Sequence, residues 1–96
     1  MKKIDFLRLL ISFFDGLIIF ILALRMRTAL SIEKCKRRNG QPIYNESVEK
    51  ERLSEVRGMA DVWRVGPSFT KETVEIFKKI IALSRDLQEE QRNDTS

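Results

Sequence analysis

Histidine is absent from this 96-residue sequence, and cysteine occurs once, at Cys35. Without histidine the chain cannot form the Ser-His or Cys-His pairs of nucleophilic enzymes, and it lacks the commonest ligand of transition metals. A single cysteine excludes an intramolecular disulfide, and Cys35 is interpreted as an ordinary helix residue. The absence of histidine therefore removes most transition-metal sites, and if the chain is an enzyme its chemistry is expected not to need the usual base near neutral pH.

Proline and glycine are also scarce, with two prolines and four glycines in the chain. Both prolines and two of the glycines lie in two turn-like stretches, "RNGQP" at 38–42 and "VGP" at 65–67. The three segments that these turns separate are rich in helix formers and carry apolar residues at helical spacing. We expect an all-α fold in a single domain over residues 1–96. Its helices are expected at about 1–38, 45–64 and 70–91, with Asn45 and Thr70 as N-caps and a frayed tail at 92–96.

The net charge of +4 is unevenly distributed along the chain. Residues 1–40 hold nine Lys/Arg and three Asp/Glu, whereas residues 41–96 hold nine Lys/Arg and eleven Asp/Glu. A basic half indicates an anionic partner, which could be a nucleic acid, a membrane surface or an acidic small molecule. The basic stretch "KCKRR" at 34–38 has no interleaved aromatic residue. It is therefore interpreted as a solvated helix end, and no nucleic-acid binding is expected.

The run from Phe6 to Leu24 is almost continuously apolar and nearly long enough to cross a bilayer. It can be interpreted as a transmembrane helix, a secretion signal or a buried helix. Arg8 and Asp15 lie inside the run, and such charges disfavour both a membrane span and a signal, so we expect burial and no membrane contact. A first helix of about 35 residues extends about 50 Å, too far for two shorter helices of the same chain to cover. We therefore expect an intertwined homodimer, in which a second copy of this helix lies antiparallel to the first.

One side of the first helix is apolar through Ile11 and Ile18. Further along the chain the same side carries Arg25 and Lys36, which lie three turns apart and point in nearly the same direction. Two alternatives remain open, namely long side chains that reach solvent where the helix surfaces, or an anion-binding pocket. Arg8 points about 100° away from both cations, so in the second case it would serve a pocket on a partner subunit.

Polar residues on the other two helices could belong to the same pocket. Ser84 and Gln88 lie one turn apart on the last helix, beside apolar positions. They mark either a boundary with solvent or two hydrogen-bonding groups of one site. Glu49 lies in the first turn of the middle helix, where the helix dipole alone would favour a carboxylate.

In their order along the chain, these residues resemble the AroQ class of chorismate mutases, the all-helical type. The resemblance runs from about Leu7 to Gln88. Its parts are "LR" at 7–8, Asp15, Arg25, Lys36, "PIY" at 42–44, Glu49, "IF" at 76–77, Ser84 and Gln88. It implies an intertwined helical dimer with two equivalent sites, a cytoplasmic location and no cofactor. The implied reaction is the rearrangement of chorismate to prephenate in phenylalanine and tyrosine biosynthesis, which needs no nucleophile, proton transfer or metal.

The resemblance also implies a role for each site residue. Arg8 of the partner subunit and Arg25 would bind substrate carboxylates, while Ser84 would line the pocket near a carboxylate. Lys36 would contact a carboxylate and the ether oxygen, and Gln88 would hydrogen-bond the same ether oxygen. Glu49 would hold the substrate hydroxyl. Catalysis is thus expected from selection of the compact substrate conformer and from stabilisation of negative charge on the ether oxygen, carried by Lys36, Gln88, Arg25 and Glu49.

Two positions depart from the family pattern. Asn45 stands where the family usually has Asp, and an amide can still cap a helix and bind a substrate hydroxyl. Val48 stands where the family usually has another site arginine, so the site loses a cation that Arg52, one turn on, is expected to replace. Three alternatives remain open: a diverged helical dimer that only binds or regulates, an enzyme like isochorismate pyruvate-lyase, and a single-pass membrane protein.

Overall fold

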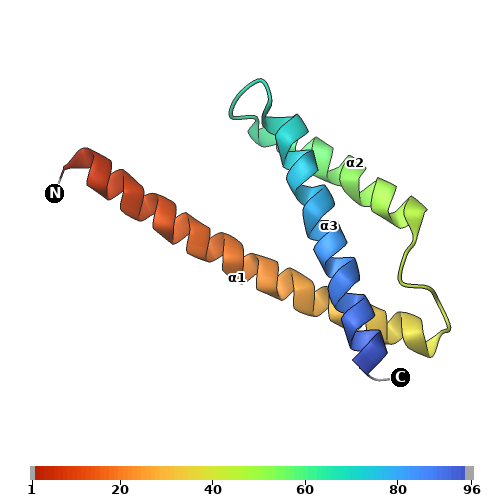
Figure 1. Ribbon diagram of the computed structural model, residues 1–96. Coiled ribbons are helices and arrows are strands. Elements are labelled where there is room, and N and C mark those ends of the chain that lie inside the picture. Colours follow the sequence, from red (N-terminus) through yellow and green to blue (C-terminus); the bar gives the residue numbers. More distant parts are fainter. Residues whose placement is uncertain (1, 95–96) are drawn as a thin grey trace.

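Three helices make up the computed structural model, which describes residues 2–94 (Figure 1). They are α1 (Lys3–Arg38), α2 (Glu46–Trp63) and α3 (Phe69–Asp94). The predicted all-α fold with a long first helix is confirmed. Within the described residues α3 packs against both α1 and α2, while no comparable backbone contact joins α1 to α2. The space between α1 and α2 therefore holds side chains and a cavity.

The helix boundaries follow local chemistry. The Oδ1 of Asn45 accepts a hydrogen bond from the backbone N–H of Val48 at 3.2 Å, which confirms Asn45 as the N-cap of α2. Gly40 follows α1 with φ of +67°, a left-handed conformation that glycine adopts at little cost. The prediction for Thr70 was wrong, because α3 begins one residue earlier, at Phe69. The Thr70 hydroxyl instead donates to Oδ1 of Asp61 and ties the start of α3 to α2.

The end of α3 is held against α1 by a buried ionic cluster. Glu33 is fully buried, and its carboxylate accepts hydrogen bonds from Gln91 at 3.2 Å and from Arg92 Nε at 2.6 Å. Burial acts to raise the pKa of Glu33, but these hydrogen bonds and the charges of Arg92 and Arg37 outweigh it and hold the pKa below its ordinary value. Because of these contacts α3 continues to Asp94, beyond the expected end at 91. Within the expected frayed tail, 92–94 are therefore helical, and 95–96 lie outside the described residues.

The apolar core of the single chain is small and lies where α3 contacts the other two helices. It consists of Met26, Val56, Ala60, Val74 and Ile81. The N-terminal half of α1 projects away from this core (Figure 1). By length and composition α1 is apolar enough to cross a membrane, and its most apolar window has no cover from the rest of the chain. The burial expected for this run therefore has to come from outside the chain.

Candidate active site

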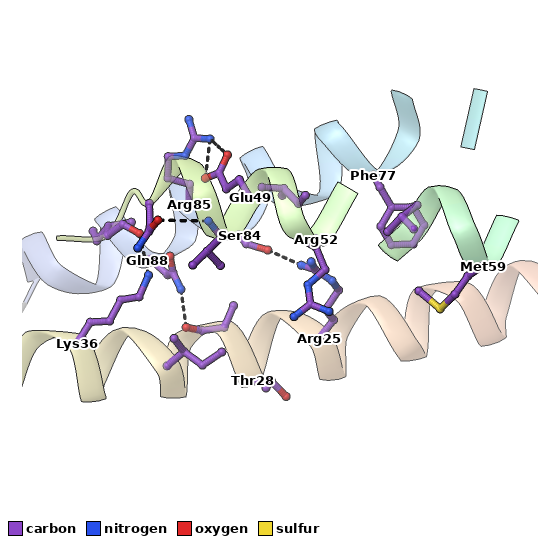
Figure 2. Close-up of a pocket in the computed structure, with 17 residues that line it drawn as sticks. Arg25, Thr28, Lys36, Glu49, Arg52, Met59, Phe77, Ser84, Arg85 and Gln88 are labelled. Carbon is purple, nitrogen blue, oxygen red and sulfur yellow. Dashed lines mark hydrogen bonds and ion pairs between the residues drawn. The ribbon is translucent and has the colours of Figure 1, made fainter. Parts of the chain in front are cut away.

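A cavity of about 430 Å³ opens between α1, α2 and α3, within the size range of small-molecule sites (Figure 2). Its lining comes from the C-terminal half of α1, the connection to α2, most of α2 and the middle of α3. It brings together every predicted site residue except Arg8. These residues are Arg25, Lys36, Asn45, Val48, Glu49, Arg52, Ser84 and Gln88. Their chemical roles stay predictions.

Arg25 is fixed at one end of the cavity. Its Nη1 donates to Oγ of Ser84 at 2.8 Å, and the Ser84 hydroxyl lies 3.1 Å from the carbonyl oxygen of Ile80. Burial lowers the pKa of Arg25 from its ordinary value, and the charge of Arg52 lowers it further. Two cations from different helices therefore face each other across this end of the cavity, as Figure 2 shows. Such a pair favours an anion between them.

Lys36 and Gln88 lie toward the other end. The Nζ of Lys36 donates to the carbonyl oxygen of Ile43 at 3.0 Å, which leaves two of its protons for other acceptors. Arg25 and Lys36 are eleven residues apart, so about 16 Å of helix axis separates them. Gln88 is buried, and its Nε2 donates to the carbonyl oxygen of Ala29 at 2.7 Å. One Nε2 proton therefore remains for a ligand at a position that the bond to α1 fixes.

The site residues near the start of α2 have contacts of their own. The Oδ1 of Asn45 accepts from Val48 N–H and from the Ser47 hydroxyl at 2.9 Å, so this oxygen serves the helix cap. Val48 contributes an apolar wall. Arg52 also lines the cavity, and its Nη1 makes a 2.7 Å ion pair with Glu55 in a half-exposed setting. Exposed pairs of this kind contribute little, so Arg52 can exchange Glu55 for a ligand anion at small cost.

Arg85 is a site residue that the sequence reasoning missed. Its Nη2 lies 2.6 Å from one carboxylate oxygen of Glu49 and 2.9 Å from the other. Its guanidinium also lies over the Tyr44 ring, 4.7 Å from the centroid. The signal was present in the sequence, because Arg85 precedes Gln88 by three residues and so lies next to it on the same side of the helix.

The apolar part of the lining was not predicted either. These residues line the parts of the cavity wall where no charged side chain lies, and they come from all three helices and from the connection at residue 43. They are Ala29, Ile32, Ile43, Val56, Met59, Phe77 and Ile81, and the polar Thr28 lies beside them in the lining. Sequence periodicity marks such residues as core, and it does not separate a residue that lines a cavity from one that packs against a neighbour.

Arg8 lies outside this cavity. It precedes Arg25 by seventeen residues on the same unbroken helix, which places it about 26 Å away along the axis. Asp15, between them, is exposed and makes no hydrogen bond or ion pair with any described residue. The cavity formed by the described residues of one chain therefore does not include Arg8.

The sequence matches the protein-family model of chorismate mutase type II over residues 7–89. Comparisons with curated proteins and with solved structures find no match. The matched range contains the whole lining of the cavity and nearly all of the three helices. The resemblance found from the residues is thereby confirmed, and the chain belongs to the chorismate mutase type II family, whose activity is that of an isomerase.

Proposed function

We propose that this chain converts chorismate to prephenate in the cavity between its three helices, as a step of aromatic amino acid biosynthesis in the cytoplasm. One observation carries the proposal. A single cavity of small-molecule size places Arg25 and Arg52 at one end and Lys36 at the other, with Gln88 beside Lys36. This arrangement suits a dianion whose two carboxylates are separated and whose ether oxygen lies near one of them.

The reaction makes limited demands on the protein. Within one substrate molecule the ether C–O bond breaks as a new C–C bond forms, so no proton or group passes to or from the chain. The enzyme must hold the compact conformer of a flexible dianion, and fixed cations at both ends of a cavity can do this. Arg25 is suited to the task because Ser84 and burial already restrict its position.

Negative charge grows on the ether oxygen as its bond breaks. Lys36 and Gln88 are the donors that we assign to this oxygen, because each keeps a free proton while a backbone carbonyl fixes its position. Preorganised donors of this kind stabilise a transition state without reorganisation, and removal of one typically costs on the order of 10²–10³ in rate. Glu49 and Asn45 are assigned to the ring hydroxyl of the substrate.

Arg52 is proposed to supply the cation that Val48 does not. The two residues lie one turn apart on α2, and Arg52 is close enough to Arg25 for its charge to lower the pKa of that residue. A carboxylate bound between Arg25 and Arg52 would neutralise this repulsion. Arg52 would therefore replace the arginine that the family usually has at the position of Val48, from the next turn of the same helix.

The active enzyme is proposed to be an intertwined homodimer. Thirteen large apolar side chains between Ile4 and Leu24 are 43–67 % exposed in the single chain, more than a monomeric protein normally leaves in water. A second copy of α1 offers a cover of the same length and composition. The same packing would bring Arg8 of the partner subunit toward the cavity. The alternative, in which this half of α1 enters a membrane, is disfavoured by Arg8 and Asp15.

A second candidate function rests on Val48. Its apolar side chain at an expected cation position also suits a helical dimer that binds a ligand without converting it, or one that cleaves isochorismate with release of pyruvate. Product analysis separates these candidates, because the mutase forms prephenate, the lyase releases pyruvate from isochorismate, and a binding protein converts neither compound.

The test is to add the purified protein to chorismate, follow the loss of chorismate absorbance, and identify the product by NMR. Prephenate as the product supports the proposal. Unchanged chorismate beside pyruvate release from isochorismate would support the lyase, and no conversion of either compound would support a binding protein. A native mass of two chains, measured without detergent, is expected in the same preparation.

A further inference from the structure

The carboxylate of Glu49 is paired with the guanidinium of Arg85, which also lines the cavity. Both of its carboxylate oxygens contact Nη2 of Arg85, on the wall formed by α2 and α3 opposite α1 (Figure 2). The side chains of Glu49 and Arg85 keep only 25 % and 35 % of their exposure, so the pair is screened much less than the surface pairs of α2 and α3. The Tyr44 ring beneath the guanidinium fixes it from a second side.

The charge of Glu49 is a difficulty for the proposed substrate. A carboxylate in the wall of a cavity that must accept a dianion repels that dianion, and a charge at such short range is worth about tenfold or more in affinity. Arg85 places an opposite charge in contact with this carboxylate. The other cations of the cavity, Arg25, Lys36 and Arg52, are then left for the substrate.

One donor of Arg85 is left unused by the contact with Glu49. The Arg85 Nε is buried without a hydrogen-bond partner among the described residues, and an unsatisfied buried donor costs free energy. The guanidinium is therefore oriented with Nη2 on Glu49 while its Nε stays without a partner. Arg85 itself is among the residues that line the cavity, so the side of α3 that carries it faces the cavity.

We propose that Arg85 is a positioning residue of this site, which fixes the Glu49 carboxylate for the substrate hydroxyl and cancels its charge so that the dianion can bind. The proposal rests on the chorismate mutase function proposed above. Arg85 acts through Glu49 and does not contact the reacting atoms. Removal of Arg85 is therefore expected to act mainly on KM.

The test is a double-mutant cycle of Arg85→Gln and Glu49→Gln, with kcat and KM for chorismate measured at low salt. Arg85→Gln alone is expected to raise KM about tenfold and to change kcat less than about threefold. In the background of Glu49→Gln, which keeps an acceptor oxygen but no charge, Arg85→Gln is expected to change KM less than about threefold. Arg85→Lys keeps the charge and is expected to retain KM within about threefold.

The matched control is Lys78→Gln, which removes a cation and an ion pair from the same helix outside the cavity and is expected to leave KM unchanged. Equal effects of Arg85→Gln in both backgrounds, or an unchanged KM, would overturn the proposal. Urea unfolding of the same four cycle proteins reports the Glu49–Arg85 contact without substrate, and additive effects there would also overturn it. Failure of the wild-type chain to convert chorismate would instead overturn the proposed function, because the unfolding cycle does not depend on turnover.

Discussion

Arg8 and the cavity of its own chain are about 26 Å apart along α1, farther than an arginine side chain extends. If Arg8 takes part in catalysis, it must act in the site of another copy. This predicts that two inactive variants can restore each other. Arg8→Ala removes a charged hydrogen-bond donor and is expected to lower kcat/KM about 30-fold or more. Gln88→Ala removes a donor to the ether oxygen and is expected to lower kcat about 10²–10³-fold.

In a heterodimer of these two variants, one site combines an intact cavity with an intact Arg8 of the partner subunit. The other site carries both substitutions. Random assembly of equal amounts gives heterodimers in half of the molecules, each with one working site of two, so about a quarter of wild-type activity is expected to return. This quarter is several times larger than the residual activity of either variant alone.

The assay is the initial rate of chorismate loss after the two variants are co-expressed or refolded together from urea. A mixture of the two separately folded variants, assayed at once, controls for activity that does not need subunit exchange. Recovery to about a quarter supports action between subunits. If co-assembled dimers are confirmed by native mass and their rate equals the mean of the two variants, Arg8 has no role in the partner's site and the reasoning is wrong.

Three further predictions concern single positions. Lys36→Ala is expected to lower kcat about 10²–10³-fold without loss of the dimer, and near-normal turnover would remove Lys36 from the site. Arg52→Ala is expected to raise KM for chorismate about tenfold, whereas Arg57→Ala on the exposed side of α2 should not, and equal KM values would show that Arg52 does not replace the missing cation. Because the pKa of Glu33 is lowered in the folded state, its contribution to stability is present above about pH 4.5 and is lost as the pH falls below it. Urea unfolding at fixed protein concentration is therefore expected to show a smaller acid-induced loss of stability in Glu33→Gln than in wild type or in the exposed control Glu72→Gln, and an equal loss would contradict the buried pair.

Much of the fold could be predicted because its signals are local. The few prolines and glycines marked the two connections between helices. Asn45 marked the start of α2, because its side chain caps the helix through a neighbouring backbone N–H. The end of α3 could not be placed in this way. Its last turn is held by Glu33, which lies some sixty residues earlier in the chain, and no local pattern reports such a contact.

The same distinction between local signals and long-range contacts applies to the candidate site. The charged and amide groups and their order along three helices are visible in the amino-acid order, and they carry the family resemblance that the match over residues 7–89 confirms. The helix packing was needed to show that α2 and α3 bring Glu49 and Arg85 together, that Arg52 faces Arg25, and that Arg8 stays outside the cavity of its own chain. This division arises because helical periodicity fixes the direction of a side chain around the axis of its helix, whereas the packing of the helices fixes which residues lie opposite it.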